Sequence, residues 1–71
     1  MSTHRAARIA TYPMRTKEGR DLSCIRGPIA EARALRDTTL AAAPGAVVRY
    51  ETINHGIDEY YCEIVMPEAK S

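Results

Sequence analysis

The sequence contains neither phenylalanine nor tryptophan, so its large apolar side chains come from aliphatic residues, methionines and four tyrosines. It is also short, and a chain of 71 residues buries only about 60% of the surface that its unfolded form exposes. The core must therefore be thin. A thin core gives little support to a preorganised catalytic site. We expect a single small domain that acts by binding and is not an enzyme.

Long apolar stretches are absent as well. The longest uncharged stretch outside the turns runs from Thr38 to Val48, which is far short of the roughly 20 apolar residues that span a bilayer. The first residues are basic, but no apolar stretch and cleavage site follow them, so we expect no secretory signal and a cytoplasmic location. The expected domain covers residues 1–71, with a frayed end at 1–7 and a polar tail at 68–71.

Cysteine and histidine are too few to predict a catalytic or metal site. Cys24 and Cys62 match neither a CxxC redox pair nor a zinc spacing, and we expect both to be buried apolar residues. His55 is predicted in a turn, roughly 20 Å along an extended strand from Cys62, so the two cannot form a nucleophile pair. The glycines fall at predicted turns and form no phosphate loop. We assign no catalytic residue, cofactor or metal ligand.

The first third of the chain predicts a β-hairpin. Its arms are residues 8–14 and 21–26, and the loop between them ends with Gly19, which supplies the positive φ that such a loop needs. Pro13 cannot donate a ladder hydrogen bond, so the first strand is expected at an edge of the sheet.

A helix is predicted from Pro28 to Ala42, with Pro28 at its first position and Pro44-Gly45 ending it. Its apolar side chains fall within an arc of about 140° and are Ile29, Ala32, Leu35, Thr39, Leu40 and Ala43. Arg36 lies in the same arc. We expect its head to reach solvent or to pair with Glu51, Glu63 or the sheet rim; alternatively, Arg33 and Arg36 anchor an acidic partner.

Residues 46–66 predict a second hairpin with a turn at 54–56, because strict alternation marks its second arm. Tyr60, Cys62, Ile64 and Met66 form the expected core face, and Glu59, Tyr61, Glu63 and Val65 form the opposite face. The resulting order is β-β-α-β-β, an α+β domain with a four-stranded antiparallel sheet and one helix packed on one face. A right-handed crossover allows strand order 2-1-3-4 or 1-2-4-3, and Pro13 favours the second.

The sheet face opposite the helix is the predicted contact surface for a protein partner. Tyr61 is its centre, since tyrosine is enriched at interface hot spots and nothing in a two-layer domain covers that face. An exposed tyrosine also occurs in strands for its β-propensity alone. The predicted partner-contact residues are Tyr61, Glu59, Glu63, Glu51 and Asp58.

In size and in element order the chain resembles small phage-encoded inhibitors, including anti-CRISPR proteins, several of which pack one helix on an antiparallel sheet. The resemblance runs from Ile9 through the helix to the hairpin 47–65 and concerns architecture only. It implies an inhibitor that occupies a basic, nucleic-acid-binding surface of a larger complex, where acidic side chains of the second hairpin would fit.

A nucleic-acid binder is the alternative, because charge is distributed unevenly: residues 1–36 carry eight basic and three acidic groups, a balance of +5, and residues 37–71 sum to −4. Against this alternative, the second strand, residues 22–26, has no aromatic ring to stack on bases. A third hypothesis is a homodimer formed through an exposed strand edge. The residues expected to contact nucleic acid are Arg15, Lys17, Arg20, Arg26 and Arg33.

Overall fold

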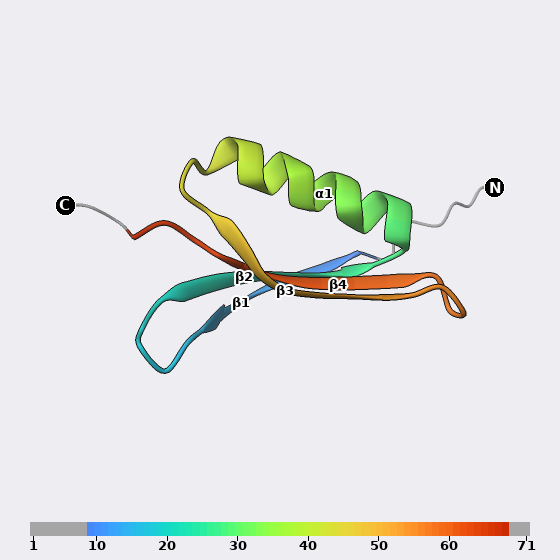
Figure 1. The fold of residues 1–71 in the computed structure, drawn as a ribbon, viewed down its shortest axis with the longest axis horizontal. Helices are drawn as coiled ribbons and strands as arrows, with labels where there is room; N and C mark the ends of the chain where they lie inside the picture. Colours follow the sequence, from blue (N-terminus) through green and yellow to red (C-terminus); the bar gives the residue numbers. More distant parts are fainter. Residues whose placement is uncertain (1–8, 69–71) are drawn as a thin grey trace.

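The computed structural model describes residues 9–68 as one four-stranded sheet with one helix on it (Figure 1). The elements are β1 (Ala10–Arg15), β2 (Asp21–Gly27), α1 (Ile29–Ala42), β3 (Val47–Asn54) and β4 (Glu59–Val65). The strands lie in the order β1-β2-β4-β3 and every neighbouring pair is antiparallel. This confirms the α+β fold and the strand order that Pro13 favoured. The predicted frayed end and residues 69–71 of the predicted tail lie outside the described residues.

The first hairpin closes through a short loop between β1 and β2. Gly19 has a φ of +87° and its N–H donates to the Thr16 carbonyl over 2.9 Å, as the turn chemistry predicted. Pro13 lies on the edge strand β1, where a missing N–H can face away from the sheet. β2 extends one residue beyond the predicted end, so Gly27, expected in a turn, is instead its buried last residue.

The helix begins one residue later than predicted, because Pro28 is its N-cap, with an extended ψ of 142°. The Pro28 carbonyl accepts the first helical hydrogen bond from Ala32 over 2.8 Å. The free N–H of Ile29 donates to the Asp58 carboxylate over 3.2 Å, so the turn of the second hairpin caps the helix. After the helix, Gly45 takes a φ of +99°, a region that glycine enters without strain.

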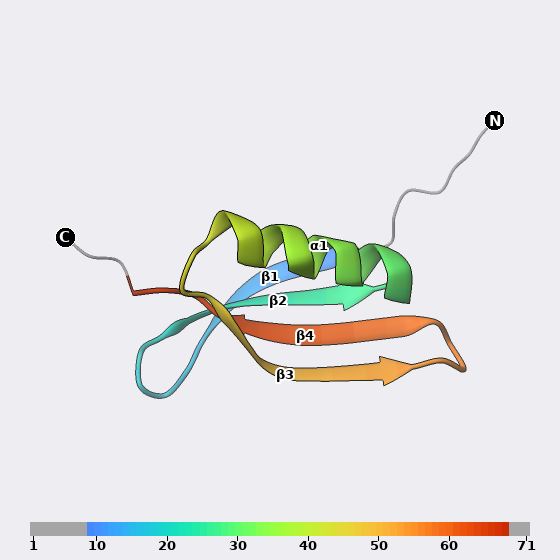
Figure 2. The same cartoon turned by 45° about the horizontal axis from the view of Figure 1, so that its top comes forward.

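The hydrophobic core lies between α1 and the two central strands. Ile25, Ala32, Tyr60, Cys62 and Ile64 are each at most 1% exposed and form one cluster, with Met66 packed at its margin. The alternation of the second hairpin therefore predicted the core face correctly. α1 makes its main contacts with β2 and β4, and β3 lies at the edge of the sheet to the side of the helix (Figure 2).

The second hairpin contains two local irregularities. In its turn, Asn54 Oδ1 accepts a hydrogen bond from the Gly56 N–H over 3.0 Å, and the positive φ falls on Asp58 at 53°. In β3, a bulge lies between Val48 and Tyr50. A bulge adds one residue to a strand and so reverses which residues face each side of the sheet beyond it.

Candidate functional site

The sheet face turned away from α1, here called the open face, carries three rows of side chains that cross all four strands. The pairing registers define them. In the order β1, β2, β4, β3, the first row is Met14, Leu22, Val65 and Val47; the second is Tyr12, Cys24, Glu63 and Tyr50; the third is Ala10, Arg26, Tyr61 and Thr52. The open face is thus mainly apolar and aromatic.

Two side chains near the centre of the open face are buried although no second layer covers that face. Cys24 is 0% and Leu22 4% exposed, and neither belongs to the core cluster under the helix. Cys24 lies next to the Tyr61 side chain. The rim remains open: Met14, Val47 and Tyr50 are about half exposed. Neighbouring side chains therefore bury the middle of this face and leave an apolar border accessible.

Tyr61 is held in place at the middle of this surface. Its hydroxyl donates to Glu63 Oε2 over 2.6 Å, and the Arg26 guanidinium lies 4.6 Å from the centre of its ring. The Tyr50 ring meets it edge-on at a centroid distance of 6.1 Å. Burial, followed by the bond to Glu63, raises the pKa of Tyr61, so the phenol stays neutral in the folded protein. Tyr61 is half-buried, on the face that the sequence predicted.

The two glutamates predicted beside Tyr61 do lie on the open face, but each is paired within the domain. Glu59 forms an ion pair with Arg26, and Glu63 accepts a hydrogen bond from Arg49 Nε over 2.9 Å. The Tyr61 hydroxyl, and then Arg49, hold the pKa of Glu63 below its usual value. The charges of the open face therefore cancel, and it presents no unbalanced acidic patch.

The other two predicted acidic contacts do not reach the open face. Glu51 lies on the helix side, where it accepts a hydrogen bond from the Tyr60 hydroxyl over 2.6 Å. The bulge explains the difference, because unbroken alternation from Val47 would have placed Glu51 on the open face. Asp58 lies in the turn and caps α1. Three of the five predicted residues are thus together, and two are elsewhere.

Sequence reasoning did not include Tyr12 and Tyr50 among the contact residues. Tyr12 is on β1, on the other side of Arg26 from Tyr61, and the Arg26 guanidinium lies against the Tyr61 ring and near the Tyr12 hydroxyl. Tyr50 reaches the open face because of the bulge. The alternation of β1 could have placed Tyr12 and Met14 on one face, but no pattern in residues 47–54 marks the position of the bulge.

Arg36, which the helix places among apolar residues, is bonded to side chains of its own domain. Its Nη1 lies 3.2 Å from the Tyr60 hydroxyl and 3.5 Å from Glu51 Oε1, and its Nη2 lies 2.7 Å from Asp37 Oδ1. Burial raises the pKa of Tyr60, whose phenol joins Arg36 to Glu51. Glu51, one of the partners expected from the sequence, thus balances Arg36 at the margin of the core.

The basic residues of the nucleic-acid alternative do not converge. Arg15 pairs with Asp21 at 3.1 Å, and Arg20 donates to the Met66 carbonyl over 2.9 Å, near the loop that holds Lys17. Arg26 lies at the other end of β2 and is neutralised by Glu59, and Arg33 is on α1 (Figure 1). The five predicted residues therefore occupy three separate places and do not form one phosphate-binding surface.

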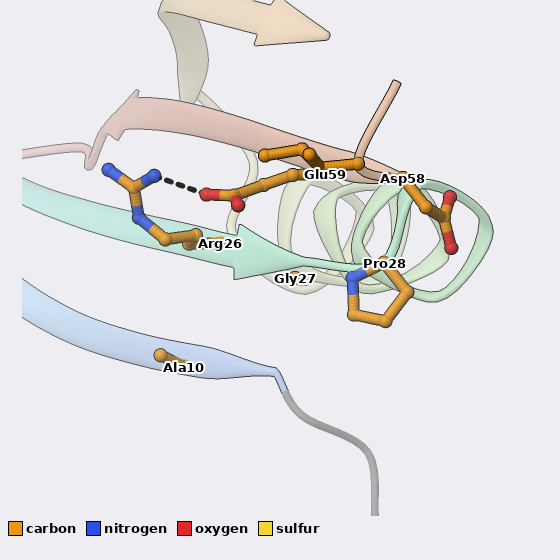
Figure 3. Close-up of a pocket in the computed structure, with 7 residues that line it drawn as sticks. Ala10, Arg26, Gly27, Pro28, Asp58 and Glu59 are labelled. Carbon is orange, nitrogen blue, oxygen red and sulfur yellow. Dashed lines mark hydrogen bonds and ion pairs between the residues drawn. The ribbon is translucent and has the colours of Figure 1, made fainter. Parts of the chain in front are cut away.

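A shallow hollow of about 390 Å³ lies where β2 leads into the helix, between Pro28 and the turn that carries Asp58 (Figure 3). Arg26 and Glu59 point toward each other at the side of this hollow, so the guanidinium and the carboxylate neutralise each other.

Over residues 9–68, no three potential ligands from histidine, cysteine, aspartate and glutamate gather closely enough to hold a metal ion. In the same range, no helix combines the length and apolar character needed to cross a membrane.

Comparison with protein-family models, with curated proteins and with solved structures gives no match for this chain. The fold and the site define a small α+β domain with one sheet face under a helix and the other face aromatic and uncovered.

Proposed function

We propose that the protein is a small non-enzymatic protein-binding module whose open face docks on a partner protein. One observation carries the proposal: on the uncovered sheet face, the central Cys24 is buried and the apolar rim at Met14, Val47 and Tyr50 is about half exposed. Apolar side chains that gather on one exposed face are typical of a contact surface. Tyrosine and methionine are also enriched in the centres of interfaces.

The balance of charge on the open face indicates the chemistry of the contact. Because Arg26 and Arg49 already neutralise Glu59 and Glu63, apolar and aromatic contacts would supply most of the affinity. The resemblance to phage-encoded inhibitors adds a more specific proposal, a basic, nucleic-acid-binding surface of a larger complex as the partner. In that case partner arginines would replace Arg26 and Arg49 beside the two glutamates.

The state of the cysteines supports a cytoplasmic location for this interaction. Cys24 and Cys62 are both free and buried. They come from adjacent strands and lie on opposite faces of the sheet, where they cannot form a disulfide with each other. A protein that needs no disulfide suits a reducing compartment.

The proposal is tested by affinity capture from the native host lysate, with and without nuclease. Met14→Lys combined with Val47→Lys places two charges at the ends of the apolar row. Ile57→Lys is the matched control, because Ile57 is 65% exposed and lies in the turn after β3, at the opposite end of the sheet from Met14 and Val47. We expect the unmodified protein and the control to retain the same partner after nuclease treatment, and the double variant to lose it.

Far-UV circular dichroism should first show that all three proteins are folded. Retention of the partner by the double variant would argue against the open face. Loss of the partner on nuclease treatment would favour the nucleic-acid alternative, which salt-dependent retardation of DNA and RNA would then have to support.

A further inference from the structure

Exposed large apolar side chains concentrate on one edge strand. Across residues 9–68 they are Met14, Val47, Tyr50, Ile53 and Ile57, of which three belong to β3 and one to the turn that follows it. The open face includes Met14, Val47 and Tyr50, but it does not include Ile53. Ile53 is paired with Tyr60, on the helix side of the sheet, and is 43% exposed because α1 packs mainly over β2 and β4.

β3 also has a free backbone edge. It pairs only with β4, and seven of its eight residues are exposed. Such an edge is a template for another strand, unless charge, proline or a bulge blocks it. β3 has a bulge near its start, but the five residues from Tyr50 to Asn54 continue regularly along β4. They form a regular, accessible pairing segment, and its charged side chain, Glu51, is already bonded to Tyr60 and Arg36.

The opposite edge of the sheet is different, because β1 carries Pro13 within its six residues. A proline interrupts the row of donors that a new strand would need. Only β3 is therefore suited to strand addition. Two identical chains that meet through the same edge form a closed, two-fold symmetric dimer, whereas pairing of β1 with β3 would continue into a fibre.

We propose that the protein forms a homodimer in which β3 pairs antiparallel with β3 of a second copy, with Thr52 on the two-fold axis. Thr52 is the midpoint of the regular segment. This register places Thr52 opposite itself, Tyr50 opposite Asn54, and Glu51 opposite Ile53. Moving the axis to residue 51 would bring two Glu51 carboxylates face to face, which destabilises a cross-strand pair.

A second observation supports the same register. A hollow of about 490 Å³ lies between α1 and β3, and Leu40, Val48 and Glu51 are among the residues that line it. With Thr52 on the axis, Ile53 of the second copy lies opposite Glu51, beside this hollow. Side chains at directly opposed positions have Cβ atoms about 4.5–5.5 Å apart. Each exposed Ile53 would thus lie beside Leu40 and Val48 of the other copy, in a hollow whose lining also includes the charged Arg36, Asp37, Arg49 and Glu51.

This inference does not rest on the proposed function, because the pairing uses the edge of β3 and leaves the open face free. The two open faces would lie side by side on one eight-stranded sheet, since each copy contributes four strands. A partner with two binding sites could then be bound more tightly than by a single copy.

Sedimentation equilibrium from micromolar to millimolar concentrations tests the dimer. We expect the unmodified protein to dimerise and Ile53→Lys to weaken the dimer about tenfold or more, a change of about 1.4 kcal/mol. Met14→Lys is the matched control, because Met14 is similarly exposed but lies on β1, and it should leave the dimer unchanged. A protein that stays monomeric throughout, or a dimer that Ile53→Lys does not weaken, would overturn the proposal.

Disulfide cross-linking tests the register. Thr52→Cys places two thiols opposite each other across the axis, within reach of a disulfide after mild oxidation. Asn54→Cys is the control, because Asn54 lies opposite Tyr50 of the second copy and not opposite itself. We expect a covalent dimer for Thr52→Cys alone. Cross-linking of Asn54→Cys but not of Thr52→Cys would reject this register. Failure of the unmodified, dimeric protein to retain any partner from the lysate would instead count only against the proposed function.

Discussion

The two faces of the sheet bury their central side chains by different means. On the helix side, Tyr60, Cys62 and Ile64 are fully buried because α1 covers them. On the open face, Cys24 is equally buried without any covering element, since larger neighbours such as Tyr61 lie across it. Complete burial of a side chain therefore does not show on which side of a two-layer domain the core lies. The exposure of the surrounding residues shows it.

The polar groups of the two faces differ in the same way. On the helix side, Arg36 and Glu51 meet through the hydroxyl of the fully buried Tyr60. On the open face, Glu63 bonds to the half-buried Tyr61 and to Arg49, whose side chain is 48% exposed. The ion pairs of the two networks are similarly exposed, at 19% and 44% for Arg36 and Glu51 and at 48% and 16% for Arg49 and Glu63. The network on the helix side should still contribute more to folding, because the Tyr60 hydroxyl makes two hydrogen bonds on a fully buried residue and the Tyr61 hydroxyl makes one on a half-buried residue.

The largest expected effect on stability comes from shortening two adjacent side chains of β4 that point to opposite faces of the sheet. Ile64→Ala removes fully buried methyl groups under the helix and should lower the free energy of unfolding by about 2–5 kcal/mol. Val65→Ala, on the half-buried row of the open face, should cost about 1 kcal/mol. Urea unfolding followed by far-UV circular dichroism measures both.

Equal losses for the two variants would mean that the open face is as closely packed as the core, and the contrast between the faces would be wrong. If Ile64→Ala does not fold at all, Ile64→Val is the milder replacement and should cost about 0.5–1.5 kcal/mol.

The sequence predicted the helix side of the sheet better than the open face, for a physical reason. β4 is a central strand without a bulge, so alternation alone assigned Tyr60, Tyr61 and their neighbours to the correct faces. β3 has a bulge, and the same alternation would put Glu51 on the wrong face and would not place Tyr50 on the open one. Local sequence contains no clear signal for a bulge, because the extra residue depends on how two strands pair.

The sequence also could not predict which arginines pair with the glutamates of the open face. Arg26 neutralises Glu59 only because β2 and β4 are neighbours in a register that places Arg26 beside Tyr61. These residues are far apart in the chain, and the strand order alone does not set the register. An acidic hairpin was therefore a reasonable prediction from composition, and the fold converts it into a neutral surface.

A smaller effect is expected from removing one hydroxyl on each face. Tyr60→Phe removes a buried hydroxyl that bonds to both Arg36 and Glu51, and it should cost about 1–2 kcal/mol because two hydrogen bonds to charged groups are lost, although Arg36 keeps its contacts with Asp37 and Glu51. Tyr61→Phe removes only the bond to Glu63, which keeps Arg49, and should cost less. Thermal or urea unfolding of the two variants compares identical chemical changes. A larger loss for Tyr61→Phe would reverse the assigned importance of the two networks.

The smallest expected effect is the pH dependence of the stability that Glu63 on the open face contributes. Tyr61 and Arg49 hold the pKa of Glu63 below its ordinary value, so the ionised carboxylate stabilises the folded protein above that ordinary value. This contribution, at most about 1 kcal/mol for such a surface pair, is lost as the pH falls through the lowered pKa. In urea unfolding at a series of pH values between neutral and acid, the difference in stability between the unmodified protein and Glu63→Gln should shrink toward low pH. Glu18→Gln, in the exposed loop of the first hairpin, is the matched control. A difference that stays constant across the series would mean that the Glu63 charge does not stabilise the open face.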